Sequence, residues 1–332
     1  MIAIQVDQLS KSYAYYTKEA GLKHSLRNLF RRERLEKEAV KGISFAIEEG
    51  EMVGFLGPNG AGKTTTLKML AGILHPSSGS ATVLGHVPWE RSKRLKMQFS
   101  IVMGQKNQLW WDLPANESFL LNRYMYEIEE HAYRRTLDEL TELLDVKELL
   151  GVQVRKLSLG ERMKMELIAA LLHRPKVVFL DEPTIGLDFM SQKKIRDFLK
   201  YYNQETNLTV ILTSHYMNDI EDLCKRSIII NNGRLVYDGE LRSVNEIVSE
   251  KKLLKLKFHQ SVAREQLARF GTVKEYEGVQ GTIEVDREQL KTNTAKILEQ
   301  LPVLDLNIED IPIEEGIARL YRKGGTEHER VG

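Results

Sequence analysis

A glycine-rich run that follows an apolar segment holds the first residues that could do chemistry. Positions 57–64 read Gly-Pro-Asn-Gly-Ala-Gly-Lys-Thr, which fits the pattern Gly-x-x-x-x-Gly-Lys-Thr in full. Glycines let backbone N–H groups turn inward onto phosphate oxygens, and the helix that follows adds the positive end of its dipole. Lys63 supplies a cation to the terminal phosphates, and the Thr64 hydroxyl suits Mg²⁺. The run predicts a phosphate-binding loop, with contacts expected from Gly57, Pro58, Asn59, Gly60, Ala61, Gly62, Lys63, Thr64 and Thr65.

Two acids at the end of an apolar segment give the second signal. Val177–Leu180 is followed directly by Asp181 and Glu182. A buried parallel strand would deliver both acids to the carboxyl edge of a sheet, beside the phosphates. Asp181 is then expected to hold Mg²⁺ through its water shell, and Glu182 to act as general base on the attacking water. The alternative for Glu182 is that it only begins the turn before Pro183.

Several further motifs stand in one order along the chain. The run Leu157-Ser158-Leu159-Gly160-Glu161-Arg162 resembles the signature motif of ATP-binding cassette ATPases, the motor subunits of ABC transporters. The resemblance covers about residues 2–240. The other matching residues are Tyr13 for adenine stacking, Gln105 for the Q-loop, Gly186-Leu187-Asp188 for the D-loop and His215 for the switch histidine.

This resemblance implies a role for each matched residue. Two cassettes would pair head to tail, so that Ser158 and the Gly160 N–H touch the γ-phosphate of an ATP held by the partner chain. Ser158 begins a helix, whose N-terminus is suited to an anion. His215 would hydrogen-bond the γ-phosphate and complete a catalytic set with Glu182 and Lys63. The remaining implied roles are Mg²⁺ and water contacts for Gln105, a metal site of Thr64, Gln105 and Asp181, and an interface contact for Asp188.

The sequence departs from the family pattern in two places. The signature motif ends in Glu161 where glutamine is usual, and Ser158 with Glu161 fits a helix capping box. Glu161 could therefore serve capping or nucleotide contact. Residues 15–38 look like an insertion, with leucines at helical spacing among many Lys and Arg residues, and are expected to form a basic amphipathic helix over 18–38. The insertion leaves Tyr15 and Tyr16 as alternatives to Tyr13 for adenine stacking.

The elements around these motifs alternate between strand and helix patterns, which favours an α/β fold with a largely parallel sheet. We expect a P-loop NTPase: a RecA-like core with the antiparallel β and helical subdomains of an ABC protein. Strands are predicted at 1–13, 43–47, 52–56, 177–180, 209–213, 228–230 and 235–237, and helices at 161–173, 190–203 and 216–225.

Five segments make up the expected domain organisation. They are an ABC ATPase nucleotide-binding domain over 1–245, an insertion at 15–38, a helical subdomain over 107–157, an accessory domain over 246–323 and a flexible tail over 324–332. In the accessory domain, strands at 252–258, 273–276, 282–285 and 304–308 and helices at 263–270 and 292–301 follow the order of a ferredoxin-like α+β unit. A terminal helix is expected over 313–321.

Composition limits the partners. The 332 residues include 48 Lys and Arg against 47 Asp and Glu, so a net charge of +1 gives no global attraction to nucleic acid. The single cysteine, Cys224, excludes an internal disulfide. The apolar runs are of strand length, so this sequence predicts no membrane span and no signal peptide. The pair Trp110-Trp111 suits either a groove for a membrane subunit or a core, and the basic segment 18–38 could rest on a membrane surface or remain a solvated face.

These observations favour an ATP- and Mg²⁺-dependent ATPase that energises transport, with export inferred from the resemblance of the accessory domain to that of exporter ATPases. The expected partners are transmembrane permease subunits on separate chains and a second nucleotide-binding subunit, most simply in a homodimer, with no nucleic acid. The expected location is peripheral, on the cytoplasmic face of the cell membrane. The alternative is a non-transport ABC ATPase that acts on ribosomes or DNA.

Overall fold

The computed structural model describes residues 1–16, 34–104, 107–244 and 251–326. The chain divides into two compact units, Met1–Asp238 and Gly239–Gly332. The predicted domain boundary lay at 245, seven residues later along the chain than this division. The first unit has two sheets and the second has one, and each unit has its own core.

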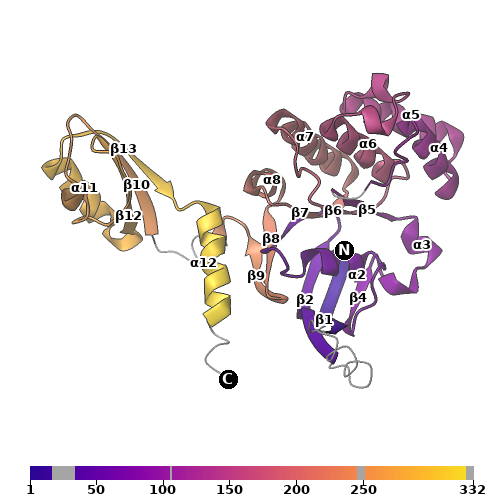
Figure 1. The fold of residues 1–332 in the computed structure, drawn as a ribbon, viewed down its shortest axis with the longest axis horizontal. Coiled ribbons are helices and arrows are strands. Elements are labelled where there is room, and N and C mark those ends of the chain that lie inside the picture. The colour runs from indigo at the N-terminus through magenta and orange to yellow at the C-terminus, as the bar shows by residue number, and fades with distance from the viewer. Residues whose placement is uncertain (17–33, 105–106, 245–250, 327–332) are drawn as a thin grey trace, which may run out of the picture. The chain divides into compact units, whose positions relative to one another are not determined.

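A six-stranded sheet forms the centre of the first unit (Figure 1). Its order is β5-β6-β7-β3-β8-β9, and the pairs from β5 to β8 are parallel. The three central strands are buried along their whole length, which explains their near-continuous apolar sequences. The strands are β3 (Met52–Leu56), β5 (Phe99–Met103), β6 (Val177–Asp181), β7 (Thr209–Thr213), β8 (Arg226–Asn231) and β9 (Arg234–Glu240).

A second sheet is antiparallel, in the order β2-β1-β4. It consists of β1 (Ile2–Tyr16), β2 (Arg34–Glu48) and β4 (Ser78–Val83). Its apolar side chains share one core with α2 (Lys63–Leu70) and with the six-stranded sheet. This common core fixes the start of α2, and therefore the phosphate loop before it, against both sheets.

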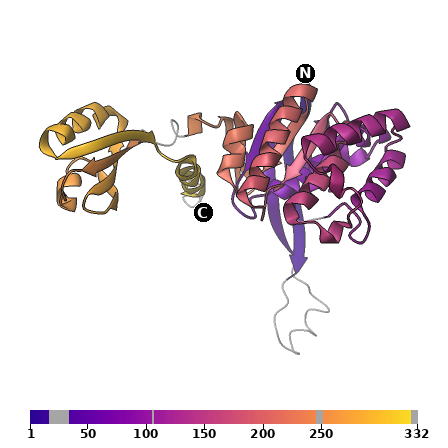
Figure 2. The same ribbon diagram turned by 90° about the horizontal axis from the view of Figure 1, so that it is seen from above.

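The ends of β1 and β2 correct the predicted helix over 18–38. Residues 34–38 belong to β2, where Arg34 pairs with Tyr16 and Glu38 with Ser12. Antiparallel pairing with β1 satisfies their backbone groups, and this outweighs the helical spacing of the sequence. The two strands project from the unit as a long arm (Figure 2). The rest of the expected helix, over 17–33, lies outside the described residues.

Helices α4 (Ala115–Met125), α5 (Glu130–Leu143) and α6 (Leu159–Leu171) gather beside the β5 edge (Figure 1). Helices α4 and α5 lie within the range 107–157 where a helical subdomain was predicted, and α6 follows it. Four short helices link the longer elements. They are η1 (Pro88–Glu90), α3 (Lys93–Lys96), η2 (Lys147–Leu149) and η3 (Val154–Lys156). Helices α7 (Phe189–Thr206) and α8 (Met217–Leu223) follow β6 and β7, and Cys224, directly after α8, is buried.

The second unit has the strand order β11-β12-β10-β13, with each neighbouring pair antiparallel. This order and its connections are those of the predicted split βαββαβ unit. One face packs on the helices through a core that includes Leu254, Phe258, Ile283 and Ile297. Its elements are β10 (Lys251–Phe258), α10 (Arg264–Leu267), β11 (Thr272–Tyr276), β12 (Gln280–Asp286), η4 (Arg287–Gln289), α11 (Leu290–Gln300), β13 (Val303–Asp310) and α12 (Ile313–Thr326).

Two helix boundaries in this unit differ from the prediction. Helix α10 stops at Leu267 instead of 270, because a turn from Leu267 to Phe270 brings both side chains into the core. Helix α12 runs to Thr326 and so includes part of the tail expected to be flexible. The two glycines at 324 and 325 have low helix propensity, which is why the sequence pattern placed the end earlier. None of the described helices is both long and apolar enough to cross a bilayer.

Candidate functional site

The glycine-rich loop connects β3 to α2 and is packed tightly at both ends. A Cβ on Gly57 would lie 2.4 Å from the Ile230 carbonyl oxygen, and one on Gly62 would lie 2.5 Å from that of Ala39. Gly62 also has a φ of 109°, which an L side chain rarely adopts. A Cβ on Gly60 would meet nothing within 4 Å. The loop is thus fixed against β8 and β2 while its tip remains open, as a cradle for phosphate requires.

Lys63 is the first residue of α2 and is buried. Its Nζ donates hydrogen bonds to the carbonyl oxygens of Gly57, at 2.6 Å, and Pro58, at 3.3 Å, so the side chain folds back over the loop. Burial lowers the pKa of Lys63, and the charges of Glu182 and Asp181 oppose that shift. The ammonium group therefore lies in the field of the two acids that follow β6.

Thr64 and Asp181 meet at the carboxyl edge of the sheet. The Thr64 hydroxyl donates to Asp181 Oδ2 at 2.9 Å, and the Thr213 hydroxyl donates to Oδ1 at 2.7 Å. The Asp181 carboxylate is buried between these two hydroxyls. A hydroxyl and a carboxylate side by side are the oxygen donors that Mg²⁺ prefers. The expectation that β6 would deliver Asp181 to the phosphate loop is therefore met in the geometry.

Glu182 and His215 form the third part of the site. His215 Nε2 lies 2.8 Å from Glu182 Oε1. The Glu182 backbone is in the left-handed region, with φ at 57°, and its N–H donates to the carbonyl and hydroxyl oxygens of Thr213, each at 3.0 Å. A non-glycine residue with positive φ is strained unless its surroundings hold it. The loops after β6 and β7 thus place these two side chains together.

The predicted signature run lies at the N-terminus of α6. Glu161 Oε2 accepts hydrogen bonds from the Ser158 N–H and hydroxyl, both at 2.8 Å, and the Glu161 N–H donates to Ser158 Oγ at 3.3 Å. The hydrogen bond from the Ser158 N–H is the main cause that lowers the pKa of Glu161. The capping alternative for Glu161 is confirmed, because its carboxylate is occupied in a complete capping box.

The segment of Asp188 lies beside that helix start. Asp188 is the N-cap of α7 and accepts from the Ser191 N–H at 3.0 Å and hydroxyl at 2.5 Å. A Cβ on Gly160 would lie 2.5 Å from the Ser191 hydroxyl, and one on Gly186 would lie 3.1 Å from Leu159. The structure therefore brings the signature run and the predicted D-loop together, and both Ser158 and Asp188 are exposed.

The tyrosines considered for adenine stacking are partly described by the structure, and the predicted Q-loop glutamine is not. Tyr13 and Tyr15 are exposed on β1 at 39% and 47%, and Lys11 Nζ lies 5.5 Å from the Tyr13 ring centroid. Either ring is free to stack on a planar base. Gln105 and the side chain of Tyr16 lie outside the described residues.

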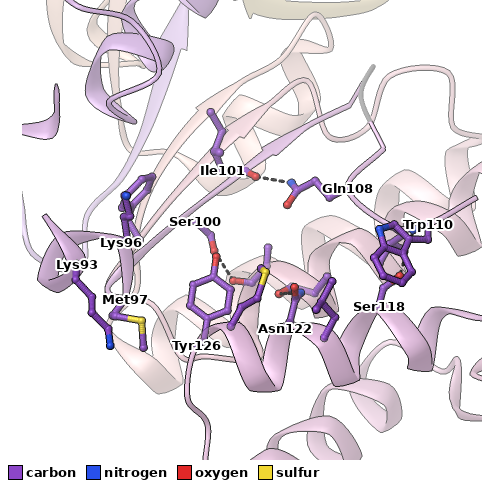
Figure 3. A pocket seen from close by; sticks show the side chains of 16 residues that line it. Lys93, Lys96, Met97, Ser100, Ile101, Gln108, Trp110, Ser118, Asn122 and Tyr126 are labelled. Carbon is purple, nitrogen blue, oxygen red and sulfur yellow. Dashed lines mark hydrogen bonds between the residues drawn. The ribbon is translucent and has the colours of Figure 1, made fainter. Parts of the chain in front are cut away.

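A cavity of about 460 Å³ lies next to the chain that follows Gln105, between β5, α4 and α6. Figure 3 shows Gln108, Trp110, Asn122 and Tyr126 around it. Trp110 and Trp111 are exposed at 51% and 46%, so the interpretation of this pair as core residues is wrong. Exposed apolar side chains continue along α4, at Leu120, Leu121, Tyr124 and Met125.

Two residues that hold the site together were missed from the sequence. Thr213 bonds both Asp181 and Glu182, and the buried Asp219 bonds the loops of Glu182 and His215. Thr213 is the last residue of the apolar strand β7, whereas Asp219 lies in α8, six residues further on. The strand end was an available signal for Thr213, because the carboxyl ends of parallel strands meet at one edge. The sequence offered no such signal for Asp219.

A loop that cradles phosphate, a lysine at the first turn of the next helix, a hydroxyl–carboxylate pair and a second acid together define a P-loop nucleoside triphosphatase. Comparison with known proteins makes the class specific. Residues 40–185 match the family model described as ABC transporter, and residues 250–309 match the EvrA-like ABC transporter C-terminal domain.

Relatives of known sequence support the same family assignment. The chain is 34% identical over 209 residues to the ABC transporter ATP-binding protein NatA of Bacillus subtilis, covering 63% of this chain and 85% of that protein. It is 36% identical over 211 residues to the Nod factor export ATP-binding protein I of Burkholderia pseudomallei, covering 64% and 69%. The chain therefore belongs to the ABC transporter family, as an ATP-binding subunit with ATPase activity.

A solved structure shows the same fold. The ATP-binding cassette MJ0796, solved as a dimer in a post-hydrolysis state with ADP and phosphate, superposes with a TM-score of 0.59 at 22% identity. The match covers 72% of this chain and 99% of that one.

Proposed function

We propose that this chain is the ATP-driven motor of an export transporter whose membrane-spanning subunits are separate chains. The observation that carries the proposal is the exposed apolar groove that α4 and Trp110 form at the cavity between β5, α4 and α6, on the same unit as the phosphate loop, Asp181 and Glu182. The name of the Nod factor export relative supports the direction of transport. The chain would act peripherally, on the cytoplasmic face of the membrane.

In the nucleotide site, the loop N–H groups and Lys63 would bind the β- and γ-phosphates of ATP. Glu182 would accept a proton from the attacking water, since its charge acts on Lys63 and its backbone is fixed by Thr213. His215, 2.8 Å from Glu182, would hydrogen-bond the γ-phosphate and hold the carboxylate in place. Tyr13 would stack on adenine.

Magnesium fits the donor set of this site. Thr64 and Asp181 would hold Mg²⁺, with Gln105 as a further ligand, and the ion would neutralise charge on the phosphates. No cluster of three or more His, Cys, Asp or Glu residues that could hold a metal occurs in the described part of the chain. Mg²⁺ commonly binds through one or two protein oxygens together with substrate phosphates, so the ion would arrive with the nucleotide.

A second copy of the chain would complete each ATP site. Ser158 and the Gly160 N–H lie at the start of the 13-residue helix α6, where they are suited to bind an anion. Phe189 and Met190, next to Asp188, are exposed at 65% and 61%. These adjacent features support a head-to-tail homodimer in which the signature run of one copy meets the γ-phosphate held by the other.

The groove supports the docking of a membrane subunit. Its floor is formed by Ser100 on β5 and Ala170 on α6, and its rim by Trp110 and Met125. Two exposed aromatic and apolar side chains beside a cavity are typical of a protein interface. Because the groove borders the chain next to Gln105, a docked subunit would respond to the state of the nucleotide.

Co-purification from membranes tests this function. The chain would be expressed with its source membranes, solubilised in detergent and captured by a tag, as wild type and as a Trp110→Ala, Met125→Ala double variant. Tyr201→Ala removes a similarly exposed aromatic on α7, away from the groove, and is the matched control. We expect a multi-helix membrane protein to be captured by the wild type and the control, and to be lost with the double variant. Capture of ribosomes or DNA without a membrane protein would overturn the transport function.

A further inference from the structure

Asp219 is a fully buried acid in α8, four residues after His215. Its Oδ2 accepts hydrogen bonds from the hydroxyls of Thr184 and Ser214, the latter at 2.7 Å. Its Oδ1 accepts from Arg196 Nη1 at 2.9 Å. The carboxylate is therefore compensated in charge and bonded through both oxygens.

The partners of Asp219 come from the loops that carry the proposed catalytic pair. Thr184 is two residues after Glu182, and Ser214 directly precedes His215. Ser214 Oγ also accepts from the Tyr216 N–H at 3.0 Å, which closes the turn around the histidine. One carboxylate oxygen thus joins the loop after β6 to the loop after β7.

The hydrogen bonds of Asp219 also help to hold the Glu182 backbone in its left-handed conformation. A left-handed, non-glycine residue remains in that conformation only where its neighbours hold it. Thr213 fixes the Glu182 N–H on one side, and the bond from Thr184 to Asp219 fixes the turn on the other. Arg196 carries the connection into α7, the helix that Asp188 caps.

We propose that Asp219 is a positioning residue that sets the distance between Glu182 and His215. This inference rests on the function proposed for those two residues, and the fully buried Asp219 would act through them and not on the substrate. Loss of either hydroxyl bond lets one loop shift relative to the other. The hydrogen bonds of Asp219 go to Thr184, Ser214 and Arg196 and not to the phosphate loop, so ATP affinity is expected to change little when they are lost.

The test uses the full chain with Thr184→Val, Ser214→Ala and the double variant, each assayed for kcat, KM for ATP and thermal midpoint. Each single variant is expected to lower kcat about tenfold, because a small misplacement of reacting groups costs this much or more, with KM changed less than about twofold. The double variant is expected to cost little more than the worse single, since both bonds end on Asp219 Oδ2. Thr184→Ser keeps the hydroxyl and is expected to restore the rate.

Thr141→Val in α5 is the matched control, because it removes an equally buried threonine hydroxyl far along the chain from the site. Asp219→Asn is expected to lower kcat as much as the double variant does. Because it also removes the negative charge that faces Arg196, the test of the inference depends on Thr184→Val and Ser214→Ala. Wild-type kcat in both single variants, or a loss no larger than that of Thr141→Val, would overturn the inference. Glu182→Gln is assayed in parallel: if it hydrolyses ATP normally, the proposed base is wrong, whereas if it is inactive while the single variants are normal, only the role of Asp219 fails.

Discussion

The imidazole of His215 lies 2.8 Å from the carboxylate of Glu182, and the two side chains differ in exposure, at 40% and 15%. The acid is thus the sheltered member of the pair and the histidine the one that faces solvent. This asymmetry suits a base held in place from one side by protein, with its partner free to contact an incoming phosphate.

Glu182→Gln is expected to lower ATP turnover by about 100-fold or more, since an amide cannot accept the proton of the attacking water. ATP binding should persist, because the phosphate loop is unchanged, and the ATP-bound dimer should accumulate. Turnover and gel-filtration mass in the presence of Mg²⁺ and ATP measure both effects. Glu148→Gln, at an exposed position in η2, is the control and should behave as wild type.

Glu161→Ala is expected to destabilise the first unit by about 1 kcal/mol, because it removes the reciprocal half of the capping box of α6. Glu161→Gln retains an acceptor for the Ser158 N–H and should lose less. Urea unfolding measures the difference. Equal stability of the alanine variant and the wild type would show that the Glu161 carboxylate contributes nothing to the stability of the fold.

His173 predicts an acid-sensitive stability of the first unit. Burial lowers its pKa from 6.5 to about 4, against a smaller opposite effect of its hydrogen bond to the Phe99 carbonyl. The unfolded chain therefore binds a proton first, so stability is full above about pH 6.5 and falls as pH decreases toward 4. The loss should reach about 3 kcal/mol.

His173→Phe keeps a ring to stack on Tyr126, whose centroid lies 3.8 Å away, and removes the titration. We expect its stability to vary less between pH 7 and pH 4.5 in urea unfolding. His131→Phe, at an exposed position, should retain the wild-type slope. An unchanged slope in His173→Phe would refute the assignment.

Glu284 holds one side of the second unit together. Burial raises its pKa, but ion pairs with Lys251, Lys274 and Arg319 outweigh this effect and lower it from 4.5 to about 2. A depressed carboxyl pKa stabilises the fold above about pH 4.5, and that contribution is lost as pH falls toward 2.

Glu284→Gln should therefore destabilise the second unit by on the order of 2–3 kcal/mol at neutral pH, and the difference from wild type should shrink in acid. Hydrogen exchange of the β10 and β12 amides in the full chain measures it. Glu309→Gln is the control, because Glu309 is more exposed than Glu284 and has one ion pair, with the exposed Lys255, and a hydrogen bond from Asn307. Equal protection in both variants at pH 7 would contradict the prediction.

The sequence predicted the parts of the site that are contiguous or directly follow an apolar strand. The loop at 57–64 and the acid pair at 181–182 each carry their chemistry within a few residues, so spacing alone identifies them. Thr213 and Asp219 were missed because their importance comes from contacts between loops about 30 residues apart. A lone threonine or aspartate has no pattern of its own.

The same dependence on distant contacts explains which strands could be predicted from the sequence and which could not. Buried strands such as β6 and β7 are apolar throughout and were predicted, whereas β4, which reads Ser-Gly-Ser-Ala-Thr-Val, has no such pattern. It forms because β1 offers a free edge to pair with. The strand at 34–38 was misread for a related reason, since its backbone partners on β1 decide the conformation and its side chains do not.

Cys224 is the one cysteine of the chain, and its thiol is buried, which raises its pKa. Because thiolate is the reactive form, reagents such as maleimides should leave it untouched in the folded protein. The native chain should therefore give no background reaction when an introduced cysteine is labelled with a thiol reagent. A cysteine introduced at the exposed Tyr201 would carry a spin label or dye at one defined place, so distances between two copies could be followed through a cycle of ATP binding and release without first removing the natural cysteine.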